Sequence, residues 1–222
     1  LNPIDGFPEY VTDSTGLSLQ RCLDPLVCFF DPIVAGDPFS LQIGSGGEAF
    51  YWAADVILND QAGAAVFKLV MAAETAFLGD NAATGGPLDG TQFPFLRFRY
   101  VFDAPADGTY TLAHPYGTEK FDVVGATGNR DIFVSYDRGL TPGQTMTGNV
   151  GPFLQSFTQP VGFVGDTNLL DLVSGGPCGN TVTLTGVNSA GNPIDFGGGQ
   201  TSLFTDLFAV QGMLYDGKVQ TP

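Results

Sequence analysis

Short apolar segments separated by turn residues run through most of this chain, and they constrain its fold more than any other feature. The clearest segment, "QFPFLRFRYVF", places Leu96, Phe98 and Tyr100 on one alternating set and Arg97 and Arg99 on the other. Successive side chains of a strand point to opposite faces, so this alternation predicts a strand. Such segments recur at roughly 8–12 residue spacing, which is typical of sandwiches. The sequence therefore predicts an all-β fold, an antiparallel β-sandwich.

Two apolar stretches need a closer reading. "AFYWAADVIL" is apolar in both alternating sets, which predicts a strand covered on both faces, with Trp52 in the core. Residues 64–78 fit a helical stripe as well as a strand face, and we favour a strand because the neighbouring segments are strands. The other predicted strands are "FSLQI", "TYTLAH", "EKFDVV", "RDIFVSYD", "TVTLTGV" and "SLFTDLFAVQGMLYDG".

The chain divides into an arm and a domain. Residues 1–37 are punctuated by proline, which disfavours a long helix or a central strand, so we expect an extended arm with one short hairpin around "YVTDSTGLSL". Residues 38–222 form the predicted β-sandwich domain, and residues 139–180 within it form a long irregular loop region of the kind that is often functional. The arm docks either on its own domain or on a neighbouring subunit. For the second case the predicted self-association residues are Ile4, Phe7, Tyr10, Val11, Leu17 and Leu19.

Charge excludes one class of partner. The net charge is −15, with only 8 Lys and Arg in 222 residues. Nucleic acids and anionic lipids require a basic surface, so we expect no nucleic-acid binding and no binding to acidic membranes. No apolar run reaches the roughly 18 residues that a membrane-spanning helix needs, so no membrane insertion is expected.

The residues for catalysis are sparse. His114 is the only histidine, and no Gly-x-Ser-x-Gly motif accompanies it. His114 precedes Pro115, which predicts an extended conformation at a strand end with the imidazole hydrogen-bonded locally. Only four glutamates are present and most aspartates fall in turns, which disfavours a glycosidase carboxylate pair. We therefore predict that the protein is not an enzyme.

Cysteine and aspartate positions suggest two structural features. Cys22 and Cys28 are close in sequence and predict a disulfide, if the protein is exported. Cys178 is left over, and a buried inert thiol is favoured over a free or interchain cysteine. Asp80 and Asp89 in "GDNAATGGPLDG" are candidate calcium ligands, although ordinary turn chemistry explains them better. We predict no other cofactor or metal.

A resemblance supports export. "ADGTYTL" resembles the turn-then-tyrosine entry into a strand of immunoglobulin-like sandwiches. "HPYGTEKFDV", "RDIFV", "GPFLQ" and "FVGD", in this order over about residues 109–167, resemble an uncharacterised family of secreted bacterial β-proteins. The resemblance implies an exported immunoglobulin-like sandwich and brings no catalytic residues with it. The chain also begins at Leu1 rather than Met, as expected after removal of a leader or pro-segment, although an artificial start would explain it too.

Two functions fit these observations. The first is a secreted or surface-exposed structural subunit of a filament or matrix that associates with identical subunits through its N-terminal arm. The alternative is an extracellular module that binds carbohydrate or another external ligand. An exposed aromatic group with Asp and Asn around it would favour binding, whereas large apolar contacts between identical chains would favour assembly.

Overall fold

The protein folds almost entirely as β-structure. The computed structural model describes residues 1–79, 88–144, 146, 148 and 150–221. Strands account for 41% of the chain and helix for 3%. The all-β prediction is therefore confirmed. No helix within these residues is long and apolar enough to cross a membrane.

In the described residues the elements are strands, apart from one short helix near the start. In order they are β1 (Val11–Thr12), β2 (Ser18–Gln20), α1 (Pro38–Ile43), β3 (Phe50–Asn59), β4 (Ala65–Phe77), β5 (Gln92–Phe102), β6 (Gly108–His114), β7 (Gly117–Val123), β8 (Ile132–Arg138), β9 (Gln155–Ser156), β10 (Asp171–Ser174), β11 (Val182–Val187), β12 (Ser202–Thr205) and β13 (Leu207–Leu214).

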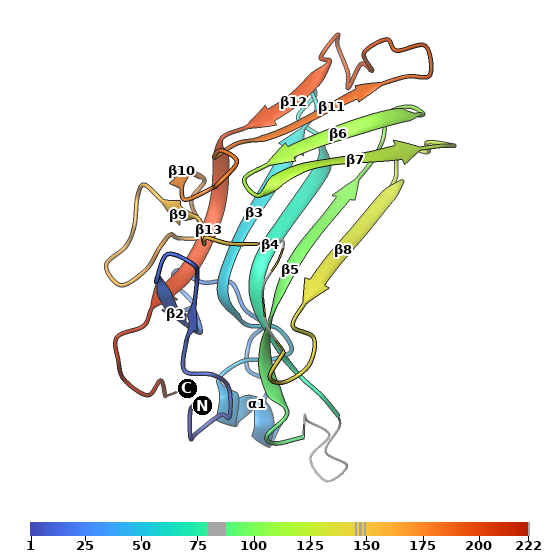
Figure 1. Ribbon diagram of the computed structural model, residues 1–222. Helices are drawn as coiled ribbons and strands as arrows, with labels where there is room; N and C mark the ends of the chain where they lie inside the picture. The colour runs from blue at the N-terminus through green and yellow to red at the C-terminus, as the bar shows by residue number, and fades with distance from the viewer. Residues whose placement is uncertain (80–87, 145, 147, 149, 222) are drawn as a thin grey trace.

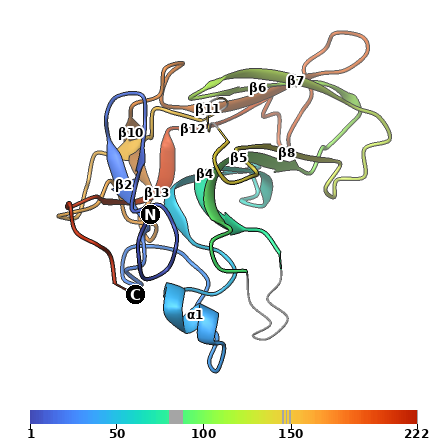
Figure 2. The same ribbon diagram turned by 60° about the horizontal axis from the view of Figure 1, so that its bottom comes forward.

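The strands form two antiparallel sheets that pack as a sandwich. The large sheet has nine strands in the order β1-β2-β13-β3-β4-β5-β8, with β10 pairing to β13 and to β9. The second sheet has four strands in the order β12-β11-β6-β7. Figure 2 shows the sheets as separate layers, with α1 on the other side of the large sheet from β6 and β7. The predicted antiparallel sandwich is confirmed.

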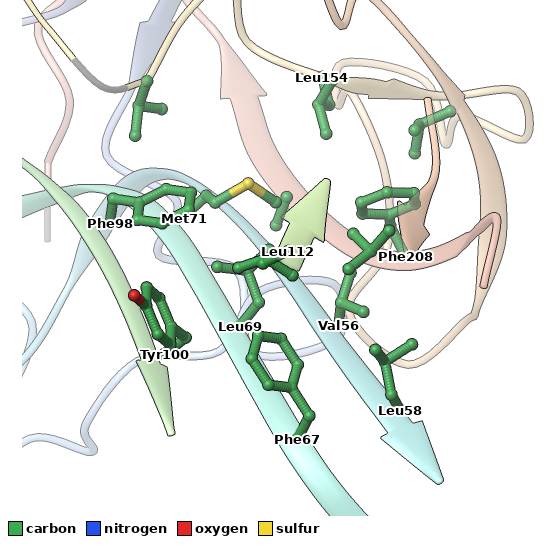
Figure 3. Close-up of a cluster of buried hydrophobic side chains, with 14 of the residues drawn as sticks. Val56, Leu58, Phe67, Leu69, Met71, Phe98, Tyr100, Leu112, Leu154 and Phe208 are labelled. Atoms are coloured by element: carbon green, nitrogen blue, oxygen red, sulfur yellow. The ribbon is translucent and has the colours of Figure 1, made fainter. Parts of the chain in front are cut away.

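The core lies between the two sheets (Figure 3). Even-numbered residues of β5 point into it, among them Phe98 and Tyr100, which are almost fully buried. From the second sheet, Tyr110 packs edge-on against Phe102 at 4.8 Å between ring centroids. Because even-numbered residues of β5 face inward, odd-numbered ones face the outer side of the large sheet.

Residues 64–78 resolve as a strand. β4 spans Ala65–Phe77 and pairs with β3 on one side and β5 on the other. The side chains of Phe67, Leu69 and Met71 are buried, whereas Val66, Lys68 and Val70 between them are half-buried or exposed. The apparent helical stripe came from apolar residues on both faces of one strand, so the favoured interpretation is confirmed.

The segment "FSLQI" was predicted as a strand, and this prediction is wrong. It forms helix α1, which begins after Asp37 and has Pro38 in its first turn. The Asp37 carboxylate accepts a hydrogen bond from the Phe39 amide at 3.0 Å, and Gly44 ends the helix with φ of 75°. An aspartate cap, a first-turn proline and a left-handed glycine are the standard signals for a short helix.

β3 is covered on both faces only in its first half. Tyr51 and Trp52 are both fully buried although they point to opposite sides of the sheet. Further along, Asp55 is half-buried and Ile57 is 53% exposed. The prediction of a strand buried on both faces therefore fails for the second half of β3, where the outer face is open.

The N-terminal arm docks on its own domain. β1 and β2 form the predicted hairpin and join the edge of the large sheet through β13. Phe7 packs with Phe39 and Ile43 in a small separate cluster. Asn2 donates a hydrogen bond to the carbonyl of Gln220 at 2.8 Å, which ties the two chain ends together (Figure 1).

A buried ion pair fixes the arm in place. Arg21 and Asp5 form a hydrogen-bonded salt bridge with almost no side-chain exposure. Arg21 also donates to the carbonyl of Ile43 at 3.1 Å, and its guanidinium lies 4.9 Å from the centre of the Phe7 ring. Because a buried charge is costly without partners, these contacts bind the arm and α1 into one unit.

Candidate functional site

The outer face of the large sheet, which is the face turned away from the second sheet, carries an unusual set of charged side chains. The strand register aligns these side chains in two rows. The first row runs Ala209, Asp55, Val70, Arg99 and Ser135, and the second runs Gln211, Ala53, Ala72, Arg97 and Asp137. Directly opposed residues in antiparallel strands have side chains in contact, so the rows bring these groups together.

A groove of about 400 Å³ lies over these rows. Small residues such as Ala53 and Ala209 form part of its floor, which leaves room above the sheet. Its lining comprises Phe29, Glu48, Phe50, Ala53, Asp55, Lys68, Val70, Glu74, Arg97, Arg99, Thr167, Asn168, Ala209 and Gln211. Ligand sites in proteins are typically concave and of this size, with a few convergent polar groups.

One wall of the groove is built by the disulfide loop and a turn from the long loop region. The side chain of Gln211 on β13 accepts a hydrogen bond from the Phe29 amide at 2.6 Å and donates to the Phe29 carbonyl at 3.0 Å. Thr167 donates from its amide to the Val27 carbonyl at 3.0 Å. These bonds hold Phe29 with its side chain 59% exposed beside the groove.

A three-residue ion cluster occupies the end of the groove near Phe95. Arg97 donates to Glu74 at 2.7 Å and to Asp137 at 3.0 Å. Its guanidinium also lies 4.8 Å from the centre of the Phe95 ring. Glu74 is only 5% exposed. Burial raises the pKa of Glu74 to about 7, in spite of the opposing charge of Arg97. The cluster therefore presents a carboxyl group that changes charge near neutral pH.

The other end of the groove holds cations with fewer partners. Lys68 lies 3.9 Å from Asp55, and both side chains are about half exposed, so this pair contributes little stability. The Nε atom of Arg99 donates to the hydroxyl of Ser135 at 3.3 Å. The Arg99 guanidinium lies 5.5 Å from the centre of the Phe133 ring, and that of Arg130 lies 4.4 Å from the same ring.

The disulfide between Cys22 and Cys28 is present, as the spacing predicted. It closes the loop that leads into the groove wall at Phe29. Cys178 is exposed, so the favoured prediction of a buried thiol is wrong. Cys178 lies in a surface turn, where its amide donates a hydrogen bond to the Pro115 carbonyl at 2.9 Å.

The disulfide should stabilise both the fold and the groove wall. Replacing both Cys22 and Cys28 by serine should lower the free energy of unfolding by about 2 kcal/mol, because the cross-link closes a loop of about seven residues. Urea unfolding of the two proteins measures this difference. An identical midpoint for the double variant and the parent under oxidising conditions would contradict the assignment.

His114 lies between the sheets and away from the groove. Its side chain is 6% exposed and its ring centre is 4.5 Å from that of Phe98. Nδ1 accepts a hydrogen bond from the Tyr116 amide at 3.3 Å, which confirms the predicted local turn. Nε2 is buried and has no hydrogen-bond partner in the described part of the chain. Burial lowers the pKa of His114 to about 4.

Acid should weaken the fold through His114. The unfolded chain takes up a proton on His114 below about pH 6.5, whereas the folded protein resists it until about pH 4. The contribution of neutral His114 to the free energy of unfolding is therefore fully present above about pH 6.5 and is lost as the pH falls toward 4. When the pH is lowered from 7 to 4.5, we expect the free energy of unfolding of His114→Gln to fall by about 2 kcal/mol less than that of the parent. Urea unfolding at the two pH values tests this, and equal losses in both proteins would contradict it.

The proposed calcium ligands fall partly outside the described residues. Asp80 is one of the residues outside the described part of the chain. Asp89 lies in a turn where Oδ1 accepts bonds from the Gly90 amide at 3.0 Å and from Gln92 at 3.3 Å. This is the turn chemistry that the sequence already favoured. Across residues 1–79, 88–144 and 150–221, no group of three or more His, Cys, Asp or Glu side chains is placed to hold a metal.

The predicted self-association residues do not form one surface. Phe7, Val11 and Leu19 are buried inside the same chain, with exposures of 1%, 5% and 0%. Leu17 is partly buried against the main core. Only Ile4 and Tyr10 are exposed, at 38% and 46%, and Tyr10 stacks on Tyr215. The assignment of Phe7, Val11 and Leu19 to a subunit contact is therefore corrected, because these side chains fill their own core.

The groove residues were not singled out from sequence. A signal existed, since Asp55 and Lys68 interrupt the two most apolar stretches and Arg97 with Arg99 form one face of a strand. Charged side chains inside otherwise apolar strands indicate a solvent-facing side with a specific use. The sequence does not show how these strands pair, or which loop forms the wall of the groove.

Comparison with known proteins gives no further identification. No protein family, curated protein or solved structure matches the chain. The fold and the groove therefore stand on the physical observations above.

Proposed function

We propose that this protein is an extracellular binding module that holds a carbohydrate in the groove on the outer face of its large sheet. The observation that carries the proposal is the lining of that groove. Carboxylates, guanidinium groups, an ammonium and side-chain amides converge there from β13, β3, β4, β5 and two loops. The neighbouring Phe29 ring is largely exposed.

The mixed lining suits a sugar better than an apolar ligand. Each sugar hydroxyl both donates and accepts hydrogen bonds, so a sugar needs partners of both kinds. Asp55 and the side-chain oxygen of Asn168 supply acceptors, and Lys68 supplies donors. An exposed aromatic ring such as Phe29 offers an apolar face for the C–H side of a sugar ring.

The groove is also preformed. Its floor is made of paired strands, and its wall is held by Gln211, Thr167 and the loop closed by Cys22 and Cys28. A site on rigid elements requires little ordering when the ligand binds. The disulfide supports an oxidising, extracellular location for such a module.

Assembly through the arm has weaker support. The assembly hypothesis needed exposed apolar side chains in residues 1–37. Several of these, such as Leu19 and Val11, are instead buried in the core of the same chain. The arm instead completes the large sheet beside β13. We therefore favour the binding module, in which the arm is a structural part of the domain.

A screen with a blocked groove tests the proposal. Oligosaccharides of neutral and acidic types, such as cellohexaose, maltohexaose, chitohexaose and tetragalacturonate, are tested by isothermal titration calorimetry against the native protein. Ala53→Phe, which fills the groove floor, should abolish the binding of any positive sugar. Ala113→Phe, on the outward side of the second sheet, serves as the matched control and should bind normally. Equal binding by both variants would place the site elsewhere.

A further inference from the structure

We infer that the groove is selective for an acidic carbohydrate, with Arg99 binding the sugar carboxylate. This inference rests on the proposed function and adds the chemical class of its ligand. It is drawn from the positions of the basic residues, from their pairing, and from the carboxylates that surround them.

The basic residues of the chain are concentrated on this face. The protein has only 8 Lys and Arg against 23 Asp and Glu. Three of the eight, Lys68, Arg97 and Arg99, line the groove, and Arg130 lies beside it over the Phe133 ring. Lys68 is far from Arg97 and Arg99 in the sequence, and the strand register brings the three together. The lining holds these three cations beside three carboxylates, so the groove is far less acidic than the protein as a whole and favours an anionic group more than the rest of the surface does.

Of the three basic residues that line the groove, Arg99 is the one for which the described residues provide no carboxylate partner. Arg97 is occupied by Glu74 and Asp137, and Lys68 lies near Asp55. Within the part of the chain that the structure describes, Arg99 has no carboxylate within 4.0 Å and makes one side-chain hydrogen bond, to Ser135. That bond uses Nε, which leaves both terminal nitrogens for a bidentate contact with a carboxylate.

The surrounding carboxylates limit what the anion can be. Asp55 is on the strand next but one to Arg99 in the same row, and Asp137 is beside Ser135 on β8. Glu48 and Glu74 line the same groove. A densely charged polymer such as a nucleic acid or an acidic peptide would bring its anions against these carboxylates. A hexuronate carries one carboxylate among several hydroxyls, so its carboxylate can meet Arg99 while its hydroxyls donate to Asp55 and Glu48.

Matched probes separate the charge from the sugar. Tetramers of galacturonate, mannuronate and guluronate are titrated into the native protein by calorimetry, each beside its methyl ester, in which the charge is removed and the sugar kept. Oligoglutamate of the same length serves as the acidic peptide. We expect at least one free uronate to bind tenfold or more tightly than its ester, with affinity falling as salt is raised. Oligoglutamate should bind more weakly than that uronate.

Variants then assign the contact. Arg99→Gln should weaken uronate binding at least tenfold and leave the affinity for the methyl ester unchanged. Arg99→Lys should recover only part of the loss, because lysine lacks the planar fork. Lys120→Gln, on β7 of the second sheet, removes one charge elsewhere and should have no effect. Circular dichroism and thermal melting confirm that each variant is folded.

The possible outcomes test the ligand class and the proposed function separately. Binding of neutral sugars or esters as tight as that of uronates, blocked by Ala53→Phe, would overturn the inference and leave the proposed function standing. Tighter binding of oligoglutamate than of any uronate would also overturn it, in favour of an acidic peptide ligand. Failure of every sugar, neutral and acidic, would overturn the proposed function itself.

Discussion

Deletion of residues 1–37 is expected to leave a chain that no longer folds. The deletion removes β1 and β2 from the edge of the large sheet and takes Leu19 and Val11 out of the main core. It also removes Phe7 from its contacts with Phe39 and Ile43. Each of these apolar side chains contributes about 1.5–3 kcal/mol when fully buried. Since whole domains are stable by only about 5–15 kcal/mol, the sum is comparable with the stability of the protein.

Thermal melting and light scattering measure the result. The truncated chain should aggregate and show no cooperative melting transition. Leu19→Ala, a milder change at a fully buried position, should still fold but lose about 2–5 kcal/mol. Ile4→Ser, at an exposed position of the same arm, serves as the control and should melt like the parent. A truncated chain that remains folded and monomeric would mean that the arm is dispensable to its own domain, as the assembly hypothesis required.

Trp52→Ala is expected to produce the largest effect of any single substitution in the core. Trp52 is fully buried in β3 and stacks on Phe153 at 5.0 Å between ring centroids. Its indole Nε1 donates to the carbonyl of Leu154 at 2.9 Å. The residue thus joins the large sheet to the long loop region. Replacing it by alanine leaves a cavity and an unpaired carbonyl, and should cost about 3–5 kcal/mol or more.

A companion variant separates the two contributions of Trp52. Trp52→Phe keeps an aromatic ring against Phe153 but cannot donate to Leu154, so it should cost much less than alanine. Urea unfolding of the parent and both variants gives the comparison. If alanine and phenylalanine were equally mild, at under about 1 kcal/mol, the loop would not be held by this side chain.

Much of the fold was predictable because alternating side chains in the sequence correspond directly to the two faces of a strand. The face assignments in "QFPFLRFRYVF" hold residue by residue, with Phe98 inside and Arg97 outside. β4 could be assigned only by its context, since its sequence is apolar on both faces. The strand predicted at "FSLQI" failed because five apolar and polar residues fit either element, and the capping groups at Asp37 and Gly44 decided the outcome.

The candidate site was predictable only in its components. Asp55, Lys68, Arg97 and Arg99 are visible in the sequence as charges within strands, but their neighbours depend on register between segments far apart in the chain. The wall at Phe29 depends on bonds to Gln211, 182 residues away. Long-range pairings of this kind leave no local signature. For the same reason the sequence did not reveal that Leu19 fills its own core rather than that of a neighbour.

The central claim is that the groove on the outer face of the large sheet is the ligand site. It is tested most directly by recording amide and side-chain nitrogen–proton shifts while tetragalacturonate is titrated into the labelled protein. The account predicts changes at the Gln211 side-chain amide, at the Arg99 Nε–H and in the facing residues of β3, β4 and β5. The second sheet, reported by Lys120 on β7, should stay unchanged. Changes confined to the second sheet, with the groove residues silent, would contradict the account.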